Sequence, residues 1–273
     1  MTSPCEVHIY CQDEVKARNI AKKILTMAKE LEQKYNFYNP DSYLSAINQR
    51  KVEKLDAQTK DLLSRSKLFY SKTDGVFDVT MGTLSSSRKL STIQAIEEVT
   101  EKLKPFVGVE HFKIQRNKIY FDNPHTLIDL GGVVKEFAVD QAVKILKKEK
   151  IVSALINFGG DIYALGAKAN GEPFRVGIKN PLKPMEYITH ADITNQALTT
   201  SASYERSHKV ESKDYSHIIT NSSLQQEIIS STVISSSTLE SGIFSTSLMI
   251  KPDLQTNLEK ILISKELNII HNN

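Results

Sequence analysis

Hydrophobic positions recur with helical spacing in the first third of the chain. Apolar residues fall on one face over residues 14–34, and the same spacing returns over residues 58–72 and 92–103. The second of these segments stops before Asp74-Gly75, a pair typical of turns. The opposite face of the first segment is rich in Lys and Glu, which indicates a solvated helix surface and not a binding patch.

Shorter alternating runs predict strands. The first is expected at residues 6–10, and a hairpin is expected around Arg116-Asn117, with arms at 112–115 and 118–121. Further strands are expected at residues 127–130, 151–158, 174–178, 187–193, 197–201, 217–220 and 227–235. Two more helices are expected at residues 135–148 and 239–250, with a short helix or strand at 258–267. The helices and the late strands are segregated, so the pattern predicts an α+β fold with mixed or antiparallel sheets, one domain over residues 1–273.

Composition narrows the class of protein. The chain has 273 residues, 40% of them hydrophobic, which suffices for a sizeable core. The formal net charge is only +3 without a basic block, so nucleic acid is not an expected partner. No apolar run is long enough to cross a membrane, and the sequence as written has no leader or lipobox. We expect a cytoplasmic protein, exported only if a leader is missing from this chain. Cys5 and Cys11 are expected to be free thiols.

Two loops carry candidate chemistry. An aromatic turn over residues 35–42 follows the first helix, and its rings are suited either to stacking on a planar ligand or to filling the core. The segment 73–82 presents an Asp and a Thr between apolar residues, which we expect to be exposed. It is explained either by an Asx turn or by a ligand-binding loop.

Two glycine pairs follow predicted strands. Residues 128–136 place Asp129 and then Gly131-Gly132 before a helix, where backbone N–H groups can approach an anion. Residues 157–161 repeat the strand and the glycine pair, and end on Asp161. Neither segment is a complete G-x-G-x-x-G motif, so a nicotinamide-binding fold is not indicated. Because a carboxylate at the end of a buried strand is costly without a partner, we expect Asp129 and Asp161 to line one pocket.

In order and spacing these segments resemble the motifs of the ApbE family, the FAD:protein FMN transferases. The entry to the first strand is similar over residues 1–6, read M-T-S-P-C-E. Further similar segments are residues 175–181 (R-V-G-I-K-N-P), 200–206 (T-S-A-S-Y-E-R), 215–219 (Y-S-H-I-I) and 245–248 (S-T-S-L). The resemblance spans residues 1 to about 250 and implies the family's single α+β domain.

The resemblance also implies a reaction and a set of site residues. Members of this family cleave the pyrophosphate of FAD with Mg²⁺ and attach FMN through a phosphoester to a Thr or Ser of a partner flavoprotein; some hydrolyse FAD to FMN and AMP. His217 would lie near the reacting phosphate as a proton-transfer group. Metal ligands would come from the Gly132 carbonyl, Ser245 and Thr246. FAD would be bound by Met1, Tyr38, Val76, Phe77, Asp78, Asp129, Lys135 and Ile218.

Three departures from the family pattern bear on activity. The family's late helix carries an Asp four residues before the Thr, and here that position is Gly242. The turn G-G-x-x-K-G ends here on Glu136, a carboxylate that we expect to crowd or repel a phosphate. The loop that begins Tyr215-Ser216 lacks the family's Asp-Pro and Thr-Gly. An alternative is therefore a degenerate relative that binds flavin without transferring it. We expect Gly242→Asp to strengthen Mg²⁺ binding without loss of helix stability.

Overall fold

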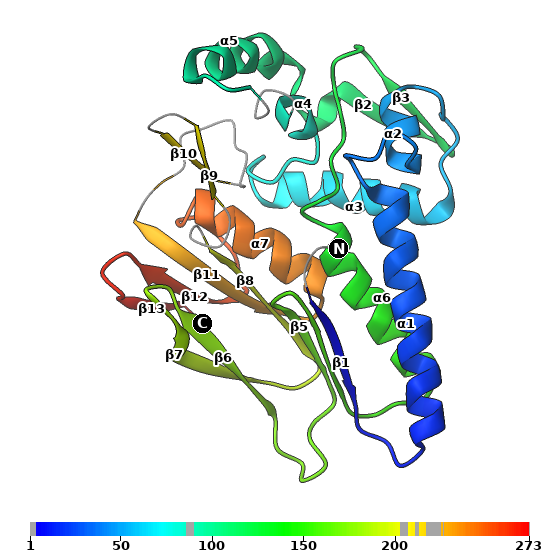
Figure 1. Ribbon diagram of the computed structural model, residues 1–273, viewed down its shortest axis with the longest axis vertical. Coiled ribbons are helices and arrows are strands. Elements are labelled where there is room, and N and C mark those ends of the chain that lie inside the picture. Colours follow the sequence, from blue (N-terminus) through cyan, green and yellow to red (C-terminus); the bar gives the residue numbers. More distant parts are fainter. Residues whose placement is uncertain are drawn as a thin grey trace. The chain divides into compact units, whose positions relative to one another are not determined.

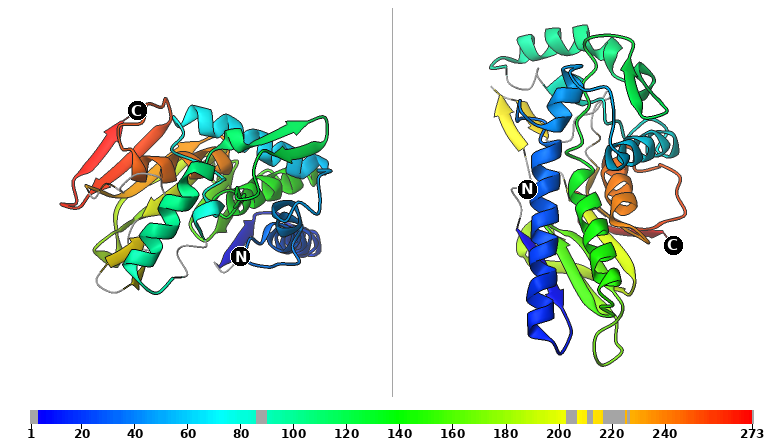
Figure 2. Two further views of the ribbon diagram at one scale, coloured as in Figure 1. Left: turned by 90° about the horizontal axis from the view of Figure 1, so that it is seen from above. Right: turned by 90° about the vertical axis from the view of Figure 1, so that its right-hand side faces the viewer.

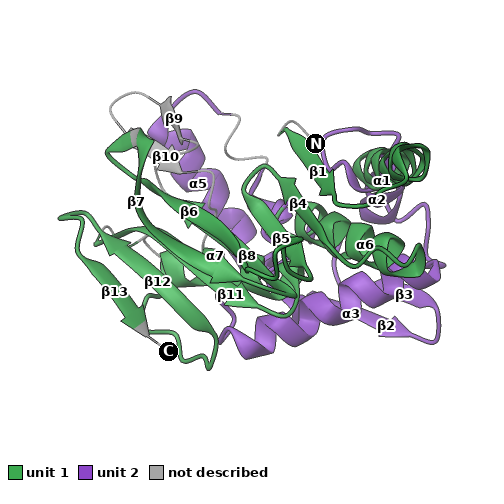
Figure 3. Ribbon diagram, turned by 90° about the horizontal axis from the view of Figure 1, so that it is seen from below, with its two compact units in different colours: residues 1–32, 132–202, 225–273 green, residues 33–131, 203–224 purple. Residues whose placement is uncertain are grey.

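The computed structural model describes residues 4–85, 90–202, 207–210, 213–216, 225 and 227–272. Its α+β class agrees with the sequence prediction. The chain divides into two compact units: unit 1 comprises residues 1–32, 132–202 and 225–273, and unit 2 comprises residues 33–131 and 203–224 (Figure 3). One long helix, α1 (Glu14–Tyr35), is the long blue helix of Figure 2; the boundary between the units falls near its end, after residue 32.

Unit 1 is built on a seven-stranded antiparallel sheet in the order β1-β4-β5-β8-β11-β12-β13 (Figure 1). Its strands are β1 (Cys5–Ile9), β4 (Ala154–Phe158), β5 (Asp161–Leu165), β8 (Gln196–Ala202), β11 (Ile228–Ser235), β12 (Glu259–Ser264) and β13 (Ile269–Asn272). A separate hairpin consists of β6 (Phe174–Asn180) and β7 (Lys183–Ile193).

Helices α6 (Val134–Lys148) and α7 (Thr238–Ile250) contact each other and pack on the same sheet. The hairpin β6–β7 packs on that sheet through an apolar cluster that includes Val176, Ile193 and Leu198. Alternating residues of β8 thus serve two purposes. Leu198 joins the apolar cluster, whereas Thr199 and Ser201 meet hydroxyls of α7.

Unit 2 contains the remaining helices and two small hairpins. The helices are α2 (Tyr43–Asn48), α3 (Ala57–Lys72), α4 (Gly82–Ser85) and α5 (Ile93–Leu103). The hairpins are β2 (Phe112–Gln115) with β3 (Lys118–Phe121), and β9 (Ser207–Val210) with β10 (Lys213–Ser216). Side-chain caps define the helix starts: the Asp56 carboxylate accepts from Thr59 N, and Thr92 Oγ1 accepts from Ala95 N.

The predicted strand at residues 127–130 is wrong. Only Leu127 makes a bridge, a parallel one to Met81. The backbone of this segment is satisfied mainly by other partners: the Asn48 side chain pairs with both the N–H and the C=O of Ile128, and Asp129 N donates to Val79 O. Among the described residues, no second strand pairs along this segment.

Other sequence predictions need smaller corrections. The strand expected at 151–158 begins only at Ala154, and the segment at 258–267, left open between helix and strand, is the strand β12. Strands β5, β9, β10 and β13 and helices α2 and α4 were not predicted. The predicted strand at 217–220 lies outside the described residues. Cys5 and Cys11 are exposed and are not joined by a disulfide, as expected. No helix within the described ranges is long and apolar enough to cross a membrane.

Candidate functional site

An aromatic and acidic cluster lies in unit 2 where α1 ends. Tyr38 is 69% exposed, and its ring meets Phe37 edge-on with centroids 5.3 Å apart. Burial raises the pKa of Tyr38, and the negative charge of Asp129 raises it further, so the two side chains share one environment. Gly82 permits this packing, because a Cβ there would lie 2.9 Å from the Phe37 ring and 3.0 Å from Asp129 Cβ. Tyr38 and Asp129, predicted to bind FAD, are thus brought together.

The loop at residues 73–82 is an Asx turn, and its acid and hydroxyl are less exposed than expected. Asp78 Oδ1 accepts from both the N–H and the hydroxyl of Thr80, each at 2.7 Å. Thr80 is fully buried, and its hydroxyl accepts from Gly108 N. Burial raises the pKa of Asp78, and the bonds from Thr80 oppose that rise. Val76 and Phe77 are half-buried beside this turn.

The first glycine pair makes a tight acidic turn. Asp129 Oδ1 accepts from Gly131 N at 2.8 Å, and a Cβ on Gly131 would lie 3.1 Å from that oxygen. Burial raises the pKa of Asp129, and the Gly131 bond only partly offsets it. Gly131 and Gly132 are both exposed, and Val133, the N-cap of α6, has no side-chain cap. The arrangement leaves backbone N–H groups at a helix start available to an anion.

The second glycine pair is a hairpin turn and not a strand-to-helix junction. Phe158 and Asp161 are paired across β4 and β5, so Gly159 and Gly160 form a two-residue loop. Their φ values are 60° and 95°, as the favoured two-residue hairpin turn requires. Asn157 Oδ1 accepts from Gly160 N at 2.9 Å and stabilises the loop. The expected repetition of an anion-binding motif is therefore wrong here.

The two predicted metal-binding hydroxyls converge in unit 1. Ser201 Oγ lies 2.9 Å from Ser245 Oγ and 3.0 Å from Thr246 Oγ1. Ser245 also donates to the Gly242 carbonyl, one turn back on α7. Ser201 lies in the T-S-A-S-Y-E-R segment, but sequence reasoning did not assign it to the site. Its position two residues beyond Thr199 on an alternating strand is the sequence signal that could have found it.

A buried carboxylate pair lies between α6 and β5. Asp161 is 2% exposed, and its Oδ2 lies 2.7 Å from Lys135 Nζ. Burial and then the charge of Asp161 raise the pKa of Glu136 to about 8, although Lys135 opposes the rise. Glu136 is 7% exposed, and its Oε2 is buried without a hydrogen-bond partner in the described part of the chain. The side chain of Glu136 is therefore buried, whereas Gly131 and Gly132 are exposed.

Gly242 and Glu136 occupy adjoining space. A Cβ on Gly242 would lie 2.5 Å from Cγ of Glu136 and 3.3 Å from its Oε1. The prediction for Gly242→Asp concerned helix propensity alone and stays a prediction. The structure adds a steric cost, because the side chain of Glu136 already fills the space that a side chain at 242 would need.

Sequence reasoning also missed Asp140. Its carboxylate accepts from Thr238 N at 2.7 Å and from Leu239 N at 3.2 Å, so α6 anchors the first turn of α7. Burial raises the pKa of Asp140, and these bonds oppose the rise. Asp140 lies four residues after Glu136, so both acids fall on one face of the helix, and this spacing is the sequence signal that could have found Asp140.

Some predicted residues cannot be placed together. Met1, His217 and Ile218 lie outside the described residues. Asp129 belongs to unit 2 and Asp161 to unit 1, so their expected convergence in one pocket stays a prediction.

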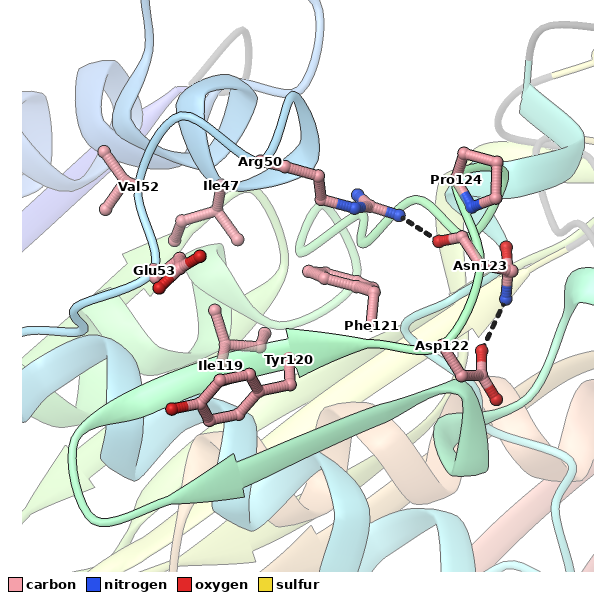
Figure 4. Close-up of a pocket in the computed structure, with 10 residues that line it drawn as sticks. All are labelled: Ile47, Arg50, Val52, Glu53, Ile119, Tyr120, Phe121, Asp122, Asn123 and Pro124. Atoms are coloured by element: carbon pink, nitrogen blue, oxygen red, sulfur yellow. Dashed lines mark hydrogen bonds between the residues drawn. The ribbon is translucent and has the colours of Figure 1, made fainter.

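A pocket of about 400 Å³ in unit 2 contains none of the predicted residues (Figure 4). On one side the Arg50 guanidinium lies 3.6 Å from the ring centroid of Phe121 and donates to the carbonyls of Asn123 and Thr126. Because the Arg50 guanidinium already donates to these carbonyls, its role is to stabilise the loop that carries them. We therefore do not assign Arg50 as an anion-binding side chain of this pocket.

The donors in unit 1 fit a small hard cation better than a soft one. Carboxylate and hydroxyl oxygens are the ligands that Mg²⁺ prefers, and it commonly takes one or two carboxylates with waters and substrate phosphates. Within the described residues there is no group of three or more His, Cys, Asp and Glu side chains suited to a metal. Elsewhere in unit 1, Glu136 offers a buried carboxylate oxygen without a hydrogen-bond partner among the described residues.

An antiparallel sheet with two helices on it and an oxygen-rich cluster at β8 and α7 defines an α+β protein with a candidate cation site. The chain belongs to the ApbE family, whose model matches residues 1–262.

Relatives and solved structures agree with this membership. The FAD:protein FMN transferase of Escherichia coli (strain K12) is 26% identical over 254 residues, covering 87% of this chain and 72% of the relative. That of Chlamydia pneumoniae is 29% identical over 209 residues, covering 74% and 64%. The fold is similar to the ApbE protein of Thermotoga maritima, with a TM-score of 0.86 at 23% identity over 99% of this chain and 94% of that one. For the flavin transferase ApbE from Vibrio cholerae the TM-score is 0.83 at 21% identity, covering 100% and 94%.

Proposed function

We propose that this protein is an FAD:protein FMN transferase that uses Mg²⁺. FAD is its substrate, and the acceptor is a Thr or Ser hydroxyl of a partner flavoprotein. The observation that carries the proposal is the convergence of Ser201, Ser245 and Thr246, which supplies oxygen donors where the family resemblance places the metal.

In this reaction the acceptor hydroxyl oxygen attacks the FMN phosphorus. A new P–O ester bond forms, the pyrophosphate P–O bond breaks, and AMP leaves with that electron pair. We assign proton removal from the hydroxyl to His217. Mg²⁺, when bound, neutralises developing charge on the phosphate oxygens. Tyr38 would stack on the flavin, and the exposed start of α6 would bind phosphate oxygens through its N–H groups.

A second candidate is flavin binding without transfer. Gly242 favours it, because the helix that carries Thr246 lacks the family's carboxylate. The buried carboxylate of Glu136 beside Gly242 argues for the transferase.

The test is incubation of the purified chain with FAD, with MgCl₂ or with EDTA, followed by chromatography for FMN and AMP. No acceptor protein is present, so water takes the place of the acceptor hydroxyl and FMN is released instead of being transferred. We expect equimolar FMN and AMP that require Mg²⁺, and a fall of about tenfold or more in Thr246→Ala. Thr200→Ala is the matched control, because the Thr200 hydroxyl pairs with Thr232 and not with the cluster. Bound FAD that yields neither product, with Mg²⁺ and without it, would favour the second candidate.

A further inference from the structure

The position of Glu136 bears on the metal site because its side chain stands where a side chain of residue 242 would stand. The Cβ that Gly242 lacks would lie within 3.3 Å of three Glu136 atoms, Cγ, Cδ and Oε1. One α-helical turn beyond Gly242, on the same face of α7, is Thr246. The carboxyl group of Glu136 is thus on the side of α7 from which an acid at 242 would reach toward that threonine.

The surroundings of Glu136 leave one of its oxygens available. Oε2 is buried and accepts no hydrogen bond from the described residues. The neighbouring carboxylate, Asp161, is already paired with Lys135 at 2.7 Å. A buried carboxylate oxygen without a donor is costly unless a ligand satisfies it, and a cation is the ligand that suits two adjacent acids.

We propose that Glu136, on α6, supplies the carboxylate of the Mg²⁺ site whose hydroxyls come from α7, and that Gly242 is glycine because this side chain needs the space. The proposal rests on the metal-dependent function proposed above. It makes the two departures at positions 136 and 242 a single exchange: the acid has moved from one helix to the other.

The exchange can be reversed by mutation. The set is the parent chain, Glu136→Gly, Gly242→Asp, the double variant and Glu136→Gln, which keeps the side-chain size. Mn²⁺ binding without FAD is measured by electron paramagnetic resonance, and thermal unfolding is followed in EDTA. Glu240→Gln is the control, since Glu240 lies on α7 but has no assigned role.

Glu136→Gln and Glu136→Gly should each weaken Mn²⁺ binding about tenfold or more, because even outer partners of metal ligands are worth about 10–100-fold. Gly242→Asp alone should lower the unfolding midpoint by several degrees, because two side chains then compete for one space. The double variant should recover both the midpoint and most of the Mn²⁺ affinity, and Glu240→Gln should bind as the parent does.

Unchanged Mn²⁺ affinity in Glu136→Gln, or a double variant that binds no better than Glu136→Gly, would overturn the proposal. A parent that binds no Mn²⁺ would overturn it too. FMN and AMP release, assayed on the same proteins, separates the two proposals. If Mn²⁺ binding changes across the variants as predicted but FAD is not cleaved, only the proposed transferase function is refuted. If FAD is cleaved equally well with and without the Glu136 carboxylate, only the proposed exchange is refuted.

Discussion

The two glycine pairs look alike in sequence and differ in structure. Gly131-Gly132 follows a segment that is neither strand nor helix, and Gly131 N donates to the Asp129 carboxylate. Gly159-Gly160 closes a hairpin and has positive φ at both positions, whereas neither Gly131 nor Gly132 does. The first pair is suited to approach by a ligand, and the second to the reversal of a strand.

The acids beside these pairs differ in the same way. Asp129 is half-buried, its carboxylate accepts a hydrogen bond from the backbone N–H of Gly131, and burial raises its pKa. Asp161 is buried against the charge of Lys135. A glycine pair next to an acid therefore does not by itself indicate a function. What distinguishes the two sites is the group that each acid contacts, a backbone N–H for Asp129 and a lysine for Asp161.

The largest difference should appear when each acid is neutralised. Asp161→Asn leaves Lys135 without its charged partner, and we expect a loss of about 2–3 kcal/mol in the free energy of unfolding, less than for a fully buried pair because Lys135 is partly exposed. Asp129→Asn keeps an oxygen for Gly131 N and should cost less than about 1 kcal/mol. Urea unfolding at pH 7 in EDTA measures both.

The pH dependence sharpens this expectation. Because burial raises the folded-state pKa of Asp129, its carboxyl ionises first in the unfolded chain as pH rises. Its contribution to stability is therefore greatest at low pH and falls as pH rises from the unfolded value through the folded one. Asp129→Asn should gain stability relative to the parent over that range. Equal losses for the two Asn variants, without this pH trend, would contradict the comparison.

A smaller difference is expected at the glycines. Gly160→Ala forces a left-handed conformation on a residue with open space around its Cβ, at a cost of about 1–2 kcal/mol. Gly131→Ala meets Asp129 Oδ1 at 3.1 Å and should change stability by less than about 1 kcal/mol, but weaken FAD binding several-fold. Fluorescence titration of FAD and urea unfolding distinguish the two effects. Weaker FAD binding in Gly160→Ala and unchanged binding in Gly131→Ala would reverse the assignment.

The smallest effect concerns the aromatic residue beside Asp129. Tyr38→Ala should weaken FAD binding by about 1 kcal/mol, the scale of an aromatic pair, with little change in stability because the ring is exposed. Tyr120→Ala, another exposed tyrosine of unit 2 on β3, is the control and should leave the dissociation constant unchanged. An unchanged constant in Tyr38→Ala would remove Tyr38 from the flavin site.

The sequence by itself determined the elements that local interactions specify. Helix α1 was predicted to within a residue, and hairpin β2–β3 matched its predicted arms, because periodicity and turn residues act over a few positions. The family motifs likewise identified Ser245 and Thr246 as neighbours on one helix. The segregation of predicted helices and late strands also predicted the α+β class.

Only the tertiary structure decided which residues meet across long stretches of chain. Residues 127–130 have strand-like composition, but the Asn48 side chain satisfies Ile128 where a second strand was expected. In the sequence, Glu136 and Gly242 were two independent departures from the family pattern. They are in contact because α6 and α7 pack on the same sheet, and a carboxyl group can enter that contact only where the facing residue has no side chain.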